Sequence, residues 1–171
     1  MSDSVIPGSP DAPASFVTAL IANLAARGLT VAVAESLTGG LVTAELIRPA
    51  GASAVVVGGV IAYDTTLKVS LLGVDQDLLD AHGPVHPEVA RQMADRVRHV
   101  LAIDGRPADL GLSTTGVAGP DPQEGAAVGT VFVGIAVGRR TDVVELHLAG
   151  SRDQIRARVV TEAVAALADR I

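Results

Sequence analysis

Cysteine and tryptophan are absent from the 171 residues, and aromatic side chains of any kind are scarce. The lack of cysteine excludes a disulfide framework and a thiolate metal site. Two phenylalanines and one tyrosine are too few to build a stacking platform for nucleic-acid bases. The net charge is −6 and the basic residues form no long run, so we expect no nucleic-acid partner. A substrate must then be held by backbone groups, hydroxyls, arginines and aliphatic walls.

Long apolar runs are also missing, although hydrophobic residues make up 49% of the chain. No run reaches the roughly 18 residues that a membrane span needs, and no signal segment with a basic start opens the sequence. We therefore expect a cytoplasmic protein without membrane contact. The length suits one domain with a sizeable core. We expect a flexible tail over residues 1–13, which is rich in Ser, Pro and Gly, and a single domain over residues 14–171.

Lysine is nearly absent too, because Lys68 is the only lysine among the 13 Lys and Arg residues. Arginine keeps its proton in proteins, whereas a buried lysine can become a neutral amine and act as a base. Lys68 therefore either occupies a position whose function arginine cannot fulfil, or is a solvent-exposed lysine present by chance. The only tyrosine, Tyr63, lies five residues before it.

The chain is organised around residues 34–40, Ala-Glu-Ser-Leu-Thr-Gly-Gly, which follow an apolar run at residues 30–34. Ser36 is predicted to lie at a strand-to-helix turn, beside the free N–H groups and positive dipole end of the next helix. That environment suits a nucleophilic serine and also a simple anion site. Glu35 either orients the site or is a carboxylate satisfied by backbone N–H groups.

The alternation of apolar runs predicts a three-layer α/β/α sandwich with a mixed, mostly parallel sheet and a C-terminal antiparallel hairpin. In such sheets the ligand crevice lies beyond the carboxyl ends of the parallel strands. Ser36, Tyr63 with Lys68, and the loop at Thr115 and Gly116 all follow strand ends, so they can converge in one cleft. The predicted strands are residues 30–34, 55–63, 109–114, 130–137 and 142–148.

Two further patterns have structural interpretations that we prefer. Gly58 and Gly59 lie inside a predicted strand, where a bulge or a closely packed helix explains them better than a ligand. His82 and His86 have a spacing found in metal sites, but Gly83 and Pro84 break any helix between them and no third ligand is evident. We expect no metal site and no cofactor.

Four stretches resemble, in chain order, the signature of the CinA carboxy-terminal domain, the nicotinamide-nucleotide amidohydrolase family. They are residues 34–40, residues 58–63 together with Lys68, residues 115–121 and residues 128–132. The resemblance covers roughly residues 14–171, and four ordered motifs are far more specific than one glycine-rich loop. The chain is similar to the stand-alone form, which lacks the large amino-terminal domain of fused members.

The resemblance implies hydrolysis of the carboxamide of nicotinamide mononucleotide to nicotinic acid mononucleotide and ammonia, a step of pyridine-nucleotide recycling. It implies Ser36 as the nucleophile, Lys68 as its partner, and Tyr63 and Thr115 as further site positions. Together with the Ala- and Val-rich helices, it predicts a homo-oligomer. The alternative is a non-catalytic nucleotide- or phosphate-binding module, or an interaction module, of the competence/damage-inducible family.

Two sets of backbone N–H groups are candidates for stabilising the oxyanion of such a reaction. One is the helix start at Thr38, Gly39 and Gly40, and the other is the loop at Thr115 and Gly116. The hydroxyls of Thr38 and Thr115 could bind either the oxyanion or a phosphate, and the sequence leaves this open.

Arg152 is the predicted contact for the 5′-phosphate, because arginine and a helix N-terminus both suit phosphate. A solvated arginine beside a helix cap at Ser151 is the alternative. Lys68 or Tyr63 is expected to pass a proton to the leaving ammonia, and nothing in the scheme needs a metal.

Overall fold

The computed structural model describes residues 14–171, and the predicted tail over residues 1–13 lies outside the described residues. Five strands form one mixed sheet in the order β2-β1-β3-β4-β5. The pairs β1–β2 and β1–β3 are parallel, whereas β3–β4 and β4–β5 are antiparallel. The strands are β1 (Val31–Glu35), β2 (Val56–Ile61), β3 (Leu110–Gly116), β4 (Thr130–Val137) and β5 (Arg140–His147).

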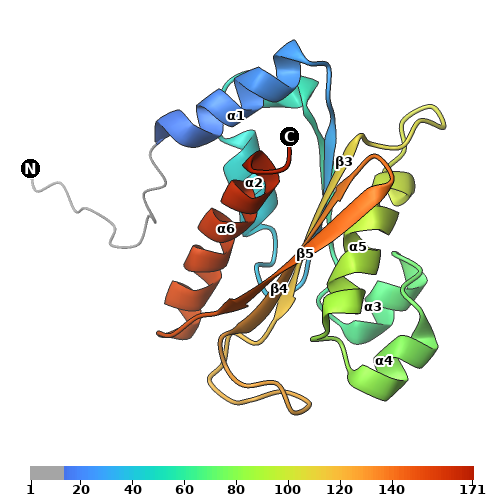
Figure 1. Ribbon diagram of the computed structural model, residues 1–171, viewed down its shortest axis with the longest axis vertical. Coiled ribbons are helices and arrows are strands. Elements are labelled where there is room, and N and C mark those ends of the chain that lie inside the picture. The colour runs from blue at the N-terminus through green and yellow to red at the C-terminus, as the bar shows by residue number, and fades with distance from the viewer. Residues whose placement is uncertain (1–13) are drawn as a thin grey trace, which may run out of the picture.

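Helices cover both faces of this sheet, which confirms the predicted three layers (Figure 1). One face carries α1 (Ala14–Ala26), α2 (Leu41–Ile47) and α6 (Arg152–Ala168), and the other carries α3 (Thr65–Ser70), α4 (Gln76–His82) and α5 (Pro87–Val100). A short 3₁₀ turn, η1 (Ala52–Ala54), precedes β2. No helix within residues 14–171 is long and apolar enough to cross a membrane.

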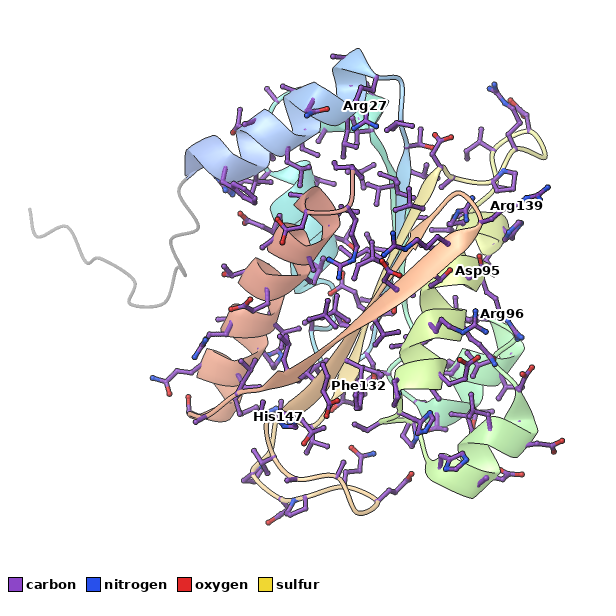
Figure 2. The ribbon with its side chains drawn as sticks, in the orientation of Figure 1. Arg27, Asp95, Arg96, Phe132, Arg139 and His147 are labelled. Atoms are coloured by element: carbon purple, nitrogen blue, oxygen red, sulfur yellow. The ribbon has the colours of Figure 1, made fainter. Side chains whose placement is uncertain are left out.

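Alternation along the central strands divides the apolar side chains between two cores (Figure 2). Val31 and Val33 of β1 pack with α1, α2 and α6, whereas Ala32 and Ala34 face the α5 side. All five residues of β1 are buried, as expected for a central strand covered on both faces. The strand therefore holds the residue that follows it in a fixed position at the edge of the sheet.

The two glycines of β2 have the structural role that the sequence favoured. The register between β1 and β2 shifts between Val31 and Ala32, and a Cβ at Gly59 would overlap the Thr43 hydroxyl of α2. Both a sheet irregularity and close helix packing are present, and it is Gly59 that brings α2 near the edge strand.

The strand boundaries differ from the sequence prediction by two residues at three ends. β3 ends at Gly116 rather than at Thr114, so Thr115 and Gly116 pair with β4 within the strand instead of forming a loop after it. β2 ends at Ile61 rather than at Tyr63, which leaves Ala62 and Tyr63 in the connection to α3. β5 begins at Arg140, because Gly138 and Arg139 alone form the hairpin turn. A two-residue turn with a positive φ at glycine suits the twist of paired strands.

Candidate active site

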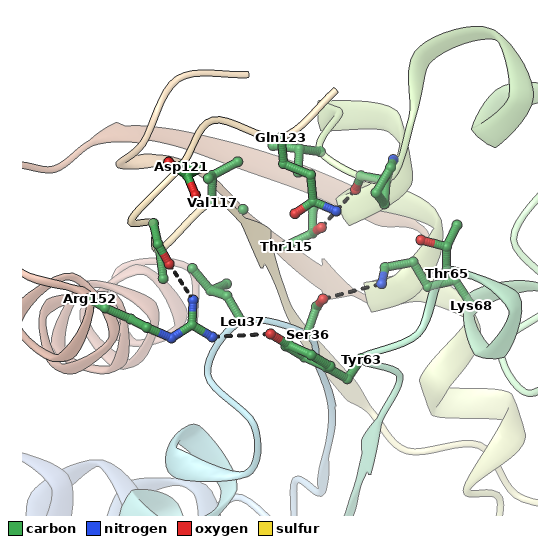
Figure 3. A pocket seen from close by; sticks show the side chains of 15 residues that line it. Ser36, Leu37, Tyr63, Thr65, Lys68, Thr115, Val117, Asp121, Gln123 and Arg152 are labelled. Carbon is green, nitrogen blue, oxygen red and sulfur yellow. Dashed lines mark hydrogen bonds between the residues drawn. The ribbon is translucent and has the colours of Figure 1, made fainter. Parts of the chain in front are cut away.

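The side chains expected at the cleft lie together at the carboxyl ends of the parallel strands (Figure 3). Ser36 follows β1, Tyr63 follows β2 and precedes α3, and Thr115 lies near the end of β3. Each strand ends where the chain must leave the sheet, so the three connections meet beside one another. The Ser36 N–H donates to the Thr114 carbonyl at 3.0 Å, which ties the first connection to β3.

Ser36 and Lys68 form the central contact of the site. Lys68 Nζ lies 3.2 Å from Ser36 Oγ and donates to the Ala62 carbonyl at 2.7 Å. Only 1% of Lys68 and 8% of Ser36 is exposed. The lone lysine of the chain is therefore buried beside the candidate nucleophile rather than left on the surface.

Burial lowers the pKa of Lys68 from 10.5 to about 8, because the charged ammonium is costly away from water. The negative charges of Asp64 and Glu124 act in the opposite direction and raise this pKa, by less. At neutral pH roughly one molecule in ten then carries a neutral amine. That amine can accept the proton of the serine hydroxyl at 3.2 Å, which is within reach for a general base.

Glu35 is fully buried and acts as the cap of α2. Its carboxylate accepts from the N–H groups of Gly40, Val42 and Thr43, and from the Thr43 hydroxyl, at 2.6 to 3.1 Å. The sequence left two interpretations of Glu35 open, and the structure supports the one in which backbone N–H groups satisfy the carboxylate. The N-terminus of α2 is thus occupied by an internal anion.

The two candidate oxyanion loops lie differently with respect to the cavity. Thr115 and Gly116 line it, whereas Thr38, Gly39 and Gly40 are not among its lining residues. The Thr38 hydroxyl lies 2.7 Å from that of Thr114 and is fully buried, and the Gly40 N–H is taken by Glu35. Of the predicted N–H donors at the start of α2, those of Gly39 and Gly40 are therefore engaged within the fold.

Thr115 lines the cavity, but its hydroxyl is already engaged within the fold. Its Oγ1 donates to the Pro84 carbonyl at 2.7 Å, and only 1% of the residue is exposed. This bond joins the end of β3 to the segment between α4 and α5. Pro84 and Val85 consequently line the cavity as well.

Arg152 and Tyr63 meet at the mouth of the cavity, as Figure 3 shows. Arg152 Nη2 donates to the Tyr63 hydroxyl at 3.1 Å, and Nη1 donates to the Gly119 carbonyl at 2.6 Å. Tyr63 is 61% exposed, and its hydroxyl is bonded to Arg152 rather than to Ser36 or Lys68. The structure thus places Arg152 among the residues that line the cavity and sets Tyr63 apart from the serine–lysine pair.

The cavity measures about 150 Å³, below the roughly 300–1,000 Å³ typical of a site for a drug-sized ligand. It has room for only a small group, so the remainder of a drug-sized ligand would lie at the mouth. Sequence reasoning missed several lining residues there. No sequence pattern pointed to Thr65, Pro84 or Val85 as lining residues. Asp121 and Gln123 lie in the polar loop that follows the Thr115 motif, and that position could have indicated them.

The two histidines with metal-like spacing stack on each other, with ring centroids 4.6 Å apart. His86 Nδ1 accepts from the Glu88 N–H and so caps α5, which explains its place before Pro87. Within residues 14–171 no three His, Cys, Asp or Glu side chains are grouped so that they could hold a metal ion.

Comparison with known proteins gives consistent results for sequence and structure. Residues 14–171 match the family model described as the CinA C-terminal domain. A curated relative from Geobacillus kaustophilus, named "Putative competence-damage inducible protein", is 49% identical over 145 residues. A relative of the same name from Caldanaerobacter subterraneus is 48% identical over 140 residues. These alignments cover 84% and 80% of this chain but only 34% and 32% of the relatives, so the chain spans about a third of their length.

Solved structures of similar size share the fold. A competence/damage inducible protein from Agrobacterium tumefaciens is 30% identical, with a TM-score of 0.83 over 96% of both chains. A competence damage-inducible protein from Klebsiella pneumoniae is 31% identical, with a TM-score of 0.83 over 92% of this chain and 96% of that one.

Proposed function

Because the chain belongs to the CinA C-terminal domain family, we propose that it hydrolyses the carboxamide of nicotinamide mononucleotide to nicotinic acid mononucleotide and ammonia. The observation that carries this proposal is the buried contact between Ser36 Oγ and Lys68 Nζ at 3.2 Å. A serine hydroxyl needs a base to become nucleophilic, and a lysine with a pKa of about 8 supplies one near neutral pH. The family resemblance of the motifs around both residues supports the choice of substrate.

The proposed reaction has two halves. Ser36 Oγ attacks the carboxamide carbon while Lys68 Nζ takes its proton, and a tetrahedral oxyanion forms. The C–N bond then breaks, the proton returns from Lys68 to the leaving nitrogen, and ammonia departs from an ester on Ser36. Water attacks this ester with Lys68 again as the base, which releases the acid and restores the serine.

Lys68 is assigned both proton transfers because the Ala62 carbonyl and Ser36 hold its amine in place. Tyr63 is assigned a binding role, since its hydroxyl is held by Arg152. Its ring can lie against the positively charged pyridine of the substrate. Arg152 is assigned the phosphate, which reaches the mouth because the cavity encloses only part of a nucleotide.

The direct test is ammonia release from nicotinamide mononucleotide, with mass-spectrometric detection of the acid product. Wild type is compared with Ser36→Ala and Lys68→Met. We expect both substitutions to lower kcat by about 10³-fold or more, because members of a catalytic unit are not independent. The exposed Arg158→Met, on the outer side of α6, is the matched control and should retain full activity.

Turnover that survives in Ser36→Ala would contradict the nucleophile assignment. A folded wild-type protein with no turnover would favour the non-catalytic binding module, which thermal-shift measurements with pyridine nucleotides and inorganic phosphate would then examine. A homo-oligomer remains a prediction of the family resemblance, and size-exclusion chromatography with light scattering tests it.

A further inference from the structure

Most backbone N–H groups in the turn after Ser36 already have an acceptor. Within the described chain, acceptors are assigned to the N–H groups of Ser36, Gly39, Gly40, Leu41, Val42 and Thr43. The N–H groups of Leu37 and Thr38 are the ones in residues 36–43 that have none. Leu37 lines the cavity beside Ser36, so its N–H is the free donor next to the nucleophile.

Arg156 holds the carbonyls of these same two residues. From the second turn of α6, its Nε donates to the Leu37 carbonyl at 2.9 Å and its Nη2 donates to the Thr38 carbonyl at 3.1 Å. One planar guanidinium thus spans two consecutive peptide groups directly after the nucleophile. The Arg156 side chain is 28% exposed, and its ion pair with Asp153 is long at 4.0 Å.

Arg156 acts on both free N–H groups through the peptide groups to which they belong, directly for Thr38 and through one further hydrogen bond for Leu37. The Leu37 carbonyl belongs to the same peptide group as the Thr38 N–H. The Thr38 carbonyl shares its peptide group with the Gly39 N–H, which donates to the Ser36 carbonyl at 3.1 Å. That last carbonyl shares its peptide group with the Leu37 N–H. A chain of hydrogen bonds therefore runs from the guanidinium to the donor beside Ser36 Oγ.

This arrangement has two physical consequences. A hydrogen bond to a carbonyl polarises its peptide group, and such chains strengthen one another away from bulk water. A donor held at a fixed position also stabilises a developing oxyanion without reorganisation. Glu35 holds the far end of the turn through the N–H groups of α2, so the turn is fixed from both sides.

We propose that Arg156 is a positioning residue for acyl transfer at Ser36, which holds and polarises residues 36–39 so that the Leu37 N–H receives the oxyanion. This inference rests on the nucleophilic role proposed for Ser36, and it does not depend on which amide is the substrate.

The test measures Ser36 modification by a fluorophosphonate, which places a phosphonyl oxygen where the oxyanion would lie. The Ser36 Oγ–P bond forms, the P–F bond breaks, fluoride leaves and Lys68 takes the serine proton. Wild type, Arg156→Met, Arg156→Lys and the control Arg158→Met are compared by intact mass. We expect labelling to slow by about 10-fold or more in Arg156→Met, because one oxyanion donor is worth about 10²–10³-fold. Arg156→Lys should restore part of the rate, and Arg158→Met should label like wild type.

Turnover of nicotinamide mononucleotide supplies a second readout. We expect Arg156→Met to lower kcat about 10-fold while KM changes less than about 3-fold, because the oxyanion forms only in the transition state. Equal labelling rates in wild type and Arg156→Met would overturn the proposal. So would a folded wild type that does not label at Ser36, since no nucleophile would then need positioning.

Labelling of Ser36 and turnover of the nucleotide together separate the role of Arg156 from the choice of substrate. If wild type labels at Ser36 in an Arg156-dependent manner but leaves the nucleotide intact, the proposed substrate is wrong and the role of Arg156 stands. Circular dichroism checks folding, and if Arg156→Met is unfolded, Arg156→Lys carries the test, because it keeps the charge but cannot span two carbonyls. Its labelling rate must then fall below that of Arg158→Lys.

Discussion

Lys68 combines two properties that one residue rarely has, since it is both the base of the proposed reaction and a buried cation. Because burial lowers its pKa to about 8, the fraction of neutral amine increases with pH through that value. We therefore expect kcat for nicotinamide mononucleotide to rise about tenfold per pH unit below the pKa and to level above it. Steady-state rates from about pH 6 to 9.5 check this, and a rate independent of pH would contradict a lysine base.

A matched control uses the charges around Lys68. Asp64 and Glu124 raise the Lys68 pKa, and Asp64 also caps α3 through the Thr66 N–H. Glu124 has no such capping role, so Glu124→Gln is the cleaner variant. It should shift the midpoint of the pH–rate profile to lower pH, because removing a nearby negative charge disfavours the ammonium.

At the residue scale, the sequence could identify Lys68 because lysine is otherwise absent and arginine cannot act as a base. It could not identify Arg156, whose partners Leu37 and Thr38 lie about 118 positions earlier in the chain. Nothing in the pattern around Arg156 distinguishes it from the exposed arginines of the same helix. The hydrogen bond from Arg152 to Tyr63 could not be predicted either, because it joins residues 89 positions apart in the chain.

At the scale of elements, α2 depends on an internal anion for its start. Its Ncap residue, Gly40, has no side chain, and Glu35 replaces the missing cap from the end of β1. We expect Glu35→Gln to lower the free energy of unfolding by about 2 kcal/mol or more, because its NH₂ would face buried N–H and hydroxyl donors. Urea denaturation measures this loss.

Glu45→Gln is the matched control on the same helix. Its partly exposed ion pair with Arg48 at 2.7 Å should contribute between about 0 and 1 kcal/mol. Equal losses in the two variants would contradict the capping role of Glu35. The sequence left this role open, because a carboxylate next to Ser36 is equally compatible with orienting the site.

The start and the apolar face of α5 are predictable from the sequence, whereas its close packing on the sheet is not. The apolar stripe of α5 and its start at Pro87 could be read directly from the sequence. The close approach could not, because it depends on Gly111 and Gly134 lying under the helix. A Cβ at either glycine would overlap the Ala94 or Ala90 carbonyl oxygen. This approach brings the segment before α5, with Pro84 and Val85, to the cavity wall.

For the whole molecule, the order of strands and the position of the cleft follow from general rules. Parallel strands place their carboxyl ends at one edge of the sheet, so motifs at or after the ends of three strands had to converge there. Side-chain partners at that edge are decided by packing between α6, α3 and the loops, which no local pattern encodes. The pairing of Ser36 with Lys68 was accordingly implied by the family resemblance, and the sequence left open whether Glu35 takes up the N–H groups at the start of α2.

The stability of the whole molecule should also depend on pH through Lys68. Its pKa falls from 10.5 in the unfolded chain to about 8 in the folded protein, so between these values the unfolded chain binds more protons. Below about pH 8 the folded protein carries the full cost of the buried ammonium, and that cost is relieved as the pH rises to 10.5. The free energy of unfolding should therefore gain about 3 kcal/mol over this window relative to Lys68→Met, which has no charge to lose. Urea denaturation of both proteins at several pH values measures the difference, and a difference that stays constant would show that burial does not lower the Lys68 pKa.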